Sequence, residues 1–339
     1  MIRKSRVHFY KPIQIAEILH HARISPNSIN LANLEEYRNE SKKWRNDVSL
    51  ELLGRISTSS SRFQDDLFNE NAIPPQVLVV LGQENTKTDG AVEAYIYRQF
   101  SNRHLQMSNG LDYALNASKE SFDIKVFIDN FRYEPGLKRS IDKIYEIVVY
   151  ALFTTLVSAL KLQVEISINK DKAPIFNEFD DFAKMVMCLD VENTKISRDA
   201  KIYRVGVTNA ADRGLDMYSN WGSAIQVKHL TLNEEMTESI VDSIPSDKVV
   251  IVCKDAEEKI ILSLLNQLGW RNRIQSIITE NNLQNWYEKA LRGKYANALG
   301  DELLLCLCDE IVNEFPSIGS TSKILKIREY DRINSDFWS

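Results

Sequence analysis

Three polar side chains near the middle of the chain have the types and the spacing to act on a phosphodiester. They are Asp216, Gln226 and Lys228. Residues two apart in a strand share a face, so Gln226 and Lys228 are expected to project together while Val227 points into the core. The turn-like link at 220–222 returns the chain, so that Asp216 can lie beside Gln226. The spacing predicts an acid, an amide oxygen and an ammonium group that meet at one point.

Such a set suits magnesium-dependent hydrolysis of a phosphodiester. Mg²⁺ prefers oxygen ligands, keeps several waters and is often held by only one or two carboxylates. A bound metal polarises the phosphate and activates a water molecule. We expect Asp216 and the side-chain oxygen of Gln226 to hold Mg²⁺, while Lys228 orients the water and stabilises charge that develops on the phosphorane.

The three residues resemble the active-site motif of the PD-(D/E)xK nuclease superfamily. That motif is an acid, a spacer of variable length, and then an acid, any residue and a lysine on a neighbouring strand. Asp216 matches the first acid and Lys228 matches the lysine. Gln226 departs from the motif because the family usually has Glu or Asp there. Glutamine offers a carbonyl oxygen but no negative charge, so metal affinity should fall unless another carboxylate takes part.

Two carboxylates are candidates for that extra role. Glu146 lies amid apolar residues, where a lone carboxylate needs a partner. The resemblance supports it, because many members of the superfamily carry a metal-binding acid on a long helix. Asp212 lies four residues before Asp216 and is the other candidate. Glu146 is favoured, and it becomes the fourth predicted catalytic residue.

The spacing alone favours a different interpretation, namely a surface strand with solvated polar residues. The order of the surrounding elements changes this. A long apolar helix at 138–160 comes first, and strands are predicted at 163–168, 201–208, 224–230, 248–253 and 274–279, with helices at 177–189 and 233–244. This order resembles the αβββαβ core of the superfamily.

The N-terminal part of the chain predicts helices instead. Helical spacing of apolar residues covers 13–22, 33–55, 77–81 and 91–100, and Ser61 could cap a further helix through residue 68. A looser stretch is expected at 101–121, and alternation at 122–131 predicts a strand.

Together these patterns predict an α/β (α+β) fold. Its core would be a mixed sheet flanked by helices, like that of PD-(D/E)xK restriction endonucleases, with a mainly helical N-terminal region. We expect a DNA-recognition region at 1–130 and a nuclease domain at 131–339.

A second resemblance covers most of the chain. The segments 42–68 and 89–98 look like the N-terminal region of the HaeII-type group of type II restriction endonucleases. The resemblance implies a homodimer that cuts a short, near-palindromic site in double-stranded DNA. It also implies a companion DNA methyltransferase that protects the host without forming a stable complex.

The N-terminal segments also contain residues that could contact DNA. Basic side chains neutralise phosphates, arginine reads guanine in the major groove, and hydroxyl groups donate to phosphates or base edges. The alternative is a solvated helix face followed by a polar loop, and the sequence does not decide between the two. The candidates are Lys42, Lys43, Arg45, Arg55, Ser59, Ser60, Arg62 and Arg98.

Composition places the chain among globular proteins. The net charge is −5, which excludes binding of DNA by bulk charge alone but permits a locally basic cleft. The four cysteines show no pairing pattern, which fits a reducing cytoplasm. The longest apolar run, at 147–156, is broken by two threonines, so we expect no membrane span and no secretion signal. The expected location is the bacterial cytoplasm.

Three other functions remain open from the residues alone. A repair or recombination nuclease could use the same core. A DNA-binding protein with a decayed site is conceivable because Gln226 is neutral. An unrelated α/β scaffold would show neither cutting nor salt-sensitive DNA binding.

Overall fold

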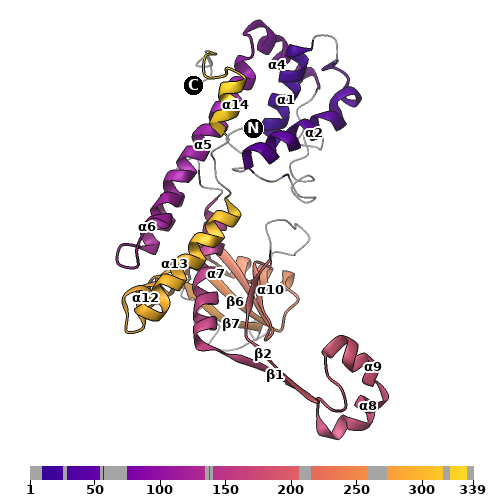
Figure 1. Cartoon of the computed structure of the whole chain (residues 1–339), viewed down its shortest axis with the longest axis vertical. Coiled ribbons are helices and arrows are strands. Elements are labelled where there is room, and N and C mark those ends of the chain that lie inside the picture. The colour runs from indigo at the N-terminus through magenta and orange to yellow at the C-terminus, as the bar shows by residue number, and fades with distance from the viewer. Residues whose placement is uncertain are drawn as a thin grey trace. The chain divides into compact units, whose positions relative to one another are not determined.

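The computed structural model describes residues 10–25, 29–53, 56, 75–133, 137, 140–205, 215–257, 273–315 and 321–333. These residues form two compact units (Figure 1). Unit 1 holds the described residues within Met1–Ile147 and Leu307–Ser339, and unit 2 those within Val148–Val205 and Arg213–Cys306. The sequence predicts a division at residue 130, whereas in the structure the C-terminal segment belongs with the N-terminal helices.

Unit 1 is helical. Its elements are α1 (Tyr10–Ile24), α2 (Leu34–Leu53), α4 (Pro75–Lys87), α5 (Ala91–Leu115), α6 (Ile124–Arg132) and α14 (Thr321–Ile327), with the first part of α7 (Ile141–Leu160) and the last part of α13 (Ala296–Glu314). Its core is built where α1 meets α2, α4 and α5, and it includes Ile13, Tyr37, Tyr97 and Phe100. Burial of this apolar surface is the main stabilising contribution to the unit.

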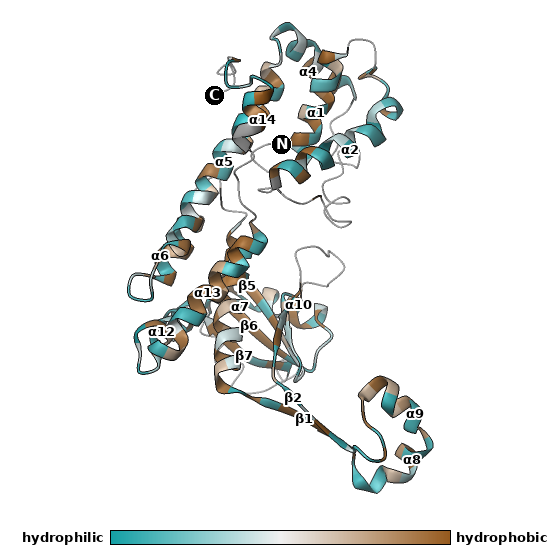
Figure 2. Ribbon diagram, in the orientation of Figure 1, coloured by the Kyte–Doolittle hydropathy of each residue, from teal (hydrophilic) through white to brown (hydrophobic). Residues whose placement is uncertain are grey.

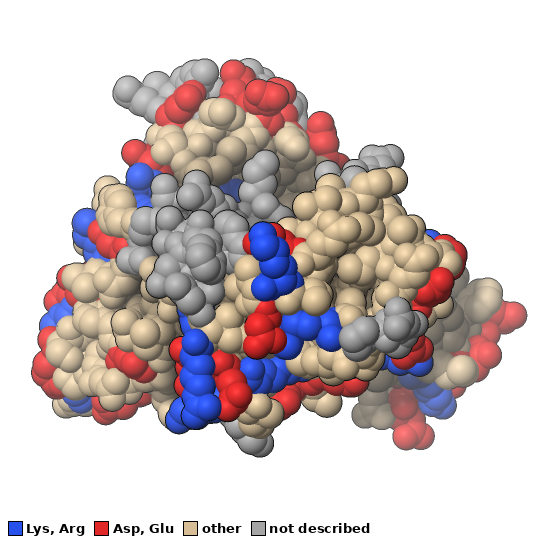
Figure 3. Space-filling model, turned by 90° about the horizontal axis from the view of Figure 1, so that it is seen from above, with Lys and Arg blue, Asp and Glu red and all other residues tan. Residues whose placement is uncertain are grey.

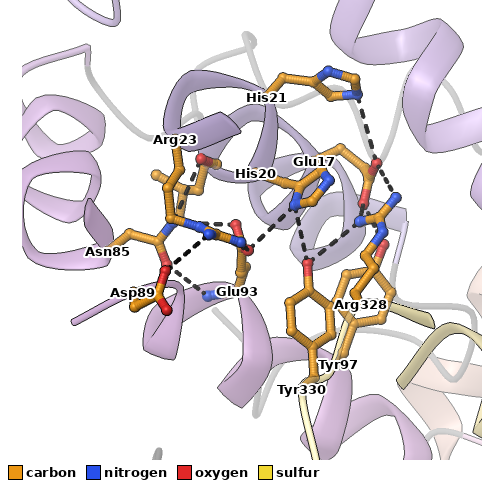
Figure 4. A network of polar contacts seen from close by, with 11 residues as sticks. Glu17, His20, His21, Arg23, Asn85, Asp89, Glu93, Tyr97, Arg328 and Tyr330 are labelled. Carbon is orange, nitrogen blue, oxygen red and sulfur yellow. Dashed lines mark hydrogen bonds and ion pairs between the residues drawn. The ribbon is translucent and has the colours of Figure 1, made fainter. Parts of the chain in front are cut away.

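A buried polar network ties the C-terminal segment to this helical core (Figure 4). Arg328 donates from Nη1 to Glu17 Oε1 at 2.6 Å and from Nη2 to Glu17 Oε2 at 3.0 Å. The hydroxyl of Tyr97 donates to the same carboxylate. Tyr330 Oη lies 3.3 Å from His20 Nδ1, which lies 3.2 Å from Glu93 Oε1. The carboxylate of Glu17, on α1, is thus neutralised by a residue from the far end of the chain.

The segment 101–132 differs from the sequence prediction. The expected loose stretch at 101–121 is wrong, because α5 continues to Leu115. The expected strand at 122–131 is also wrong, because α6 occupies this place. Asp123 caps α6 by accepting from the backbone of Lys125 at 2.7 Å. The buried residues of α6 are those at helical spacing: Ile124, Phe127, Ile128 and Phe131.

Unit 2 is built on a five-stranded mixed sheet in the order β3-β4-β5-β6-β7. The strands are β3 (Ile202–Arg204), β4 (Met217–Ser219), β5 (Ser223–Leu232), β6 (Lys248–Ala256) and β7 (Ile274–Thr279). β3, β4 and β5 are antiparallel, whereas β5, β6 and β7 are parallel. This confirms the predicted mixed sheet, and with the flanking helices it confirms the predicted fold class.

Helices flank the two faces of this sheet. On one face α10 (Glu234–Ser243) buries Ile240 and Val241 against Ala224, Val249 and Ile251. Asn233 caps α10, as predicted, by accepting from Met236 N at 2.9 Å. α7 and α12 (Glu280–Arg292) contact each other as well, since Tyr287 Oη donates to Val148 O at 2.8 Å. Much of β6 is hydrophobic in Figure 2, as expected for a central strand that is covered on both faces.

An arm leaves the sheet between α7 and β3. The antiparallel pair β1 (Gln163–Ser167) and β2 (Lys195–Asp199) forms its stem, and β2 was not predicted. The predicted helix at 177–189 is instead a series of short turns: η2 (Lys170–Lys172), α8 (Ala173–Glu178), α9 (Asp180–Phe182) and the π-helical η3 (Ala183–Met187). Figure 1 shows them at the far end of the stem.

Among the described residues, α7 is the one helix long and apolar enough to cross a membrane by length and composition, and 50% of its apolar window is buried. Helices that form the core of a soluble protein have the same composition. Its buried residues include Tyr145, Val148, Val149 and Leu152.

Candidate active site

The candidate site starts at the tight connection between β4 and β5. Gly222 has a φ of +100°, a left-handed backbone conformation that favours glycine. Ser223 N donates to Ser219 Oγ at 2.9 Å, and Asn220 Nδ2 donates to Asp199 O at 2.8 Å. The predicted turn at 220–222 is therefore confirmed, and it sets the register of the two strands.

The register places Asp216 opposite Gln226. Met217 pairs with Ile225 and Tyr218 with Ala224, so the next position along the ladder joins the acid and the amide. Gln226 Nε2 donates to Asp216 Oδ2, and the backbone N–H of Val227 donates to the same oxygen at 2.7 Å. The predicted juxtaposition of Asp216 and Gln226 is present in the structure.

Lys228 lies two residues further along β5. It is opposite Cys253 of β6, and the pairing of β5 with β6 shifts register directly after it. Such irregularities often re-aim side chains beside functional sites. Within the described residues no ion-pair partner is found for its partly buried side chain.

The surroundings determine how well a divalent metal would fit. Gln226 is only 2% exposed, whereas Asp216 and Lys228 are partly exposed. Asp216 supplies the carboxylate oxygens, and Gln226 can supply Oε1 if its amide turns over. In the part of the chain that the structure describes, no three His, Cys, Asp or Glu side chains form a group that could hold a metal ion. These ligands fit a metal held by few protein oxygens and completed by water and phosphate, as Mg²⁺ often is.

The buried thiol next to the site has no nucleophilic role. Burial, followed by the charge of Asp255, raises the pKa of Cys253 to about 12. The thiol therefore stays protonated and uncharged at neutral pH. Cys253 contributes packing to the face of the sheet that α10 covers.

Glu146 has a different environment from the one that the sequence suggested. It is buried, at 6% exposure, and Lys143 of the same helix donates to both of its carboxylate oxygens at 2.8 and 2.6 Å. The buried carboxylate of Glu146 thus has a cationic partner, Lys143, one helical turn away. Glu146 is counted with unit 1, and its role in the metal site stays a prediction. Asp212 lies outside the described residues.

The predicted DNA-contacting residues fall into three groups. Lys42 is partly exposed, and Lys43 is exposed and paired with Glu40 at 2.7 Å. Arg45 and Arg98 are held by the protein itself, since Arg45 donates to Gln14 Oε1 at 3.1 Å and Arg98 donates to Tyr330 O at 2.6 Å. The residues that lie outside the described ranges are Arg55, Ser59, Ser60 and Arg62.

Arg45 is only 1% exposed, so it points into the core of unit 1. Figure 3 shows basic and acidic side chains intermixed on one face of the molecule. On that face no extended patch of positive charge gathers among the described residues. DNA contact through Lys42 and Lys43 stays a prediction.

Two backbone contacts of Asp216 were not foreseen from the sequence. The backbone N–H of Val227 holds Asp216, and Val205 N donates to the backbone oxygen of Asp216 at 2.9 Å. Backbone donors leave no signal in residue types, because every residue except proline carries one. Only the register of β3, β4 and β5 reveals them.

Comparisons with known proteins show to which family the chain is similar. The family model described as HaeII restriction endonuclease matches residues 1–331. The type II restriction enzyme HaeII of Haemophilus aegyptius is 54% identical over 334 residues, which cover 98% of this chain and 95% of the relative. The type II restriction enzyme NgoBI of Neisseria gonorrhoeae is also 54% identical over 334 residues, covering 98% and 94% respectively. No solved structure matches the chain.

Proposed function

The chain belongs to the HaeII restriction endonuclease family, and we infer from this that it is a type II restriction endonuclease. It is a site-specific deoxyribonuclease that hydrolyses phosphodiester bonds in double-stranded DNA. Type II restriction enzymes generally use a divalent metal ion. We propose that the ion is Mg²⁺ and that the site is of the PD-(D/E)xK kind.

The observation that carries this proposal is the pairing of Asp216 with Gln226 across β4 and β5. The ladder aligns them, and Lys228 follows on the same face of β5. This arrangement supports the proposal that Asp216, Gln226 and Lys228 correspond to the acid, the second acid and the lysine of the motif. Gln226 replaces the usual second acid, which makes this a variant site.

Each residue has a distinct role in the proposed reaction. Mg²⁺, when bound, would polarise the scissile phosphate and lower the pKa of a coordinated water. Asp216 would hold the ion, and Gln226 would turn its amide so that Oε1 also faces the ion. Lys228 would position the attacking water and stabilise the negative charge on the phosphate in the transition state.

A further carboxylate would offset the charge that Gln226 lacks. We keep Glu146 as the first candidate and Asp212 as the second. Recruiting Glu146 requires the Lys143–Glu146 ion pair to open or to reorganise. If neither Glu146 nor Asp212 takes part, the site should bind the metal more weakly than a site with two acids.

The proposed partners follow from the cleavage of both strands of the DNA. Cleaving both strands calls for two sites, so we propose a homodimer, with a DNA methyltransferase of matching specificity acting separately in the bacterial cytoplasm. Of the predicted DNA contacts we retain Lys42 and Lys43 with the undescribed Arg55, Ser59, Ser60 and Arg62. We leave out Arg45 and Arg98 because their guanidinium groups already bind the protein.

The first prediction tests the site directly. Asp216→Ala should reduce Mg²⁺-dependent cutting of plasmid DNA by at least about 10³-fold, because the carboxylate that holds the ion is lost. Specific DNA binding should stay within a few-fold of wild type in a gel-shift assay. The matched control is Asp242→Ala, which removes an exposed carboxylate of α10.

Discrete bands from the wild type and from Asp242→Ala, with none from Asp216→Ala, would support the proposal. Undiminished cutting by a clean Asp216→Ala preparation would overturn the assignment of the site. Wild-type protein that binds DNA without cutting would instead support a decayed site.

A further inference from the structure

The end of the arm exposes an unusual number of apolar side chains. We call residues 170–192 the lobe. Its own core is small and consists of Phe176, Ala183 and Leu189, packed against Ile168 and Ile196. Large apolar side chains that lie outside this core are Ile175, Phe179, Phe182, Met185, Val186 and Val191, with exposures from 52% to 84%. Monomeric proteins seldom leave such a group of side chains in water without a partner.

The charge of the lobe excludes DNA as that partner. It contains three lysines and six acidic residues, a net charge of −3. One of the lysines, Lys184, is already paired with Asp180 at 2.9 Å. Phosphates would be repelled by this surface, whereas a protein surface that is apolar and basic would be attracted to it.

The stem of the arm also lacks support from its own chain. In the described part of the protein, β1 and β2 pair only with each other, and both strands are mostly exposed. Isolated two-stranded ribbons are marginally stable in water. The arm is therefore the part of unit 2 that gains most from being covered.

A cavity in the body of unit 2 has the complementary character. It has a volume of about 570 Å³ and lies on the sheet face that carries Ile225 and Val250. Aromatic side chains line it, among them Phe153, Trp286 and Tyr295. Gln226 and Lys228 lie on the opposite face of β5, so the cavity is separate from the candidate active site.

The charged residues that line the cavity are both basic. They are Lys289 and Lys294, and no Asp or Glu is among the lining residues. Tyr295 and Lys294 stand at its rim, where Tyr295 is 63% exposed and Lys294 Nζ lies 5.4 Å from the centre of the tyrosine ring. The cavity thus offers apolar walls and positive charge to an apolar, acidic lobe.

We propose that the enzyme dimerises by reciprocal docking, in which exposed apolar side chains from the lobe of each chain enter the cavity of a second copy. The proposal rests on the function inferred above in one respect: a double-strand cut calls for two catalytic sites, and each chain supplies one Asp216–Gln226–Lys228 set. A two-fold arrangement forms every lobe–cavity contact twice. This doubling helps to reach the about 1,200–2,000 Å² of buried surface that is typical of stable interfaces.

The test measures oligomeric state by sedimentation velocity of the full-length protein without DNA. A lobe variant carries Phe182→Asp and Met185→Asp, and a cavity variant carries Lys294→Glu and Tyr295→Glu. All four side chains are exposed, so the fold of each chain should survive. The matched control carries Val80→Asp and Leu105→Asp, which alter exposed apolar residues of unit 1.

We expect the wild type and the control to be dimers. Each of the other variants should weaken dimerisation by at least about 100-fold. A mixture of the lobe variant with the cavity variant should recover dimers in part, because one intact lobe still meets one intact cavity.

Dimerisation of the lobe variant with wild-type affinity would overturn the proposal, as would a monomeric wild type. A mixture that stays monomeric would show that the lobe does not enter the cavity and would also overturn it. Plasmid cutting, measured separately, keeps the two inferences apart. A wild type that dimerises as expected but never cuts contradicts only the inferred function.

Discussion

At the scale of single residues, the amide of Gln226 is the most informative group. In the absence of a metal, its N–H is the natural partner for the Asp216 carboxylate. Turning the amide over would place two oxygens together, which is unfavourable unless a cation lies between them. In the proposed site, metal binding would therefore be coupled to the orientation of this amide, and part of the binding free energy would be spent on breaking the hydrogen bond.

The second prediction follows from this coupling. Gln226→Glu should lower the Mg²⁺ concentration for half-maximal cutting by about tenfold, because a second negative charge contributes about 1.4 kcal/mol to metal binding. The cut site should be unchanged. Without metal, the adjacent carboxylates of the variant should repel each other and lower its Tm.

The control for this substitution is Gln76→Glu, which adds the same charge at an exposed position of α4. It should leave the Mg²⁺ dependence as in wild type. Equal metal dependence of Gln226→Glu and wild type would show that position 226 does not bind the ion.

His104 carries the third prediction, which concerns pH. It is 4% exposed, neither ring nitrogen has a hydrogen-bond partner among the described residues, and burial lowers its pKa to about 4. The unfolded chain therefore binds a proton between pH 6.5 and 4 that the folded chain does not. The contribution of neutral His104 to the free energy of unfolding is fully present above pH 6.5. It decreases by about 3 kcal/mol as the pH falls to 4.

Urea unfolding at pH 7 and at pH 4.5 measures this loss. His104→Leu should be more stable than wild type at pH 4.5 and should show a smaller decrease between the two values. Phe100→Leu, next to His104 in the core, is the control, and it should be less stable at both values while it keeps the wild-type decrease. If His104→Leu loses as much unfolding free energy between pH 7 and pH 4.5 as the wild type does, His104 is not the source of this pH dependence.

At the scale of elements, the β4–β5 turn controls the geometry of the site. Our fourth prediction is that Gly222→Ala costs about 1 kcal/mol of unfolding free energy. The reason is its φ of +100° and not crowding, since a Cβ there would meet nothing within 4 Å. Gly222→Asn should cost less, because asparagine tolerates this conformation better. Equal losses for both variants would argue against a purely conformational cause.

The elements also show what could be predicted from the sequence. The strands β1, β3, β5, β6 and β7 and the long apolar α7 were predicted because their patterns are regular over several residues. α6 was mistaken for a strand because Ile124 and Ile128, two of its buried residues, also fit an alternating pattern with Phe122 and Val126. The N-cap at Asp123 was the available signal that a helix follows.

The candidate site was predictable only in part. The spacing of Asp216, Gln226 and Lys228 together with the turn at Gly222 was sufficient to place the acid beside the amide. The direction of the amide hydrogen bond and the ion pair of Glu146 with Lys143 were not, because they depend on which groups are within 3 Å after folding. The lobe was likewise not foreseen, since short irregular turns have no periodicity.

At the scale of the whole molecule, unit 1 is formed from both ends of the chain. The ion pair between Glu17 and Arg328 joins α1 to the segment after α14, and the Glu17 side chain is 2% exposed. Burial lowers the pKa of Arg328. The hydrogen bond to Glu17 opposes this effect, and the net result is a pKa above the usual value for arginine. Our fifth prediction is that Arg328→Ala destabilises unit 1 by about 3–5 kcal/mol, because it leaves a buried carboxylate unpaired.

Chemical denaturation followed by intrinsic fluorescence checks this value. The double variant Glu17→Gln with Arg328→Met should lose clearly less stability than Arg328→Ala, because no unpaired charge remains. Arg332→Ala is the control, since its pair with Glu329 is exposed and should contribute less than about 1 kcal/mol. A loss near zero for Arg328→Ala would show that the pair does not join the two ends.

The joining of the two ends has a consequence for the cell that makes this enzyme. During translation, α1 emerges first, but the residue that neutralises Glu17 emerges more than three hundred positions later. No incomplete chain can finish unit 1, whereas unit 2 lies wholly within the interior of the chain. A chain that has been made only as far as α13 therefore has the buried carboxylate of Glu17 without its ion-pair partner Arg328.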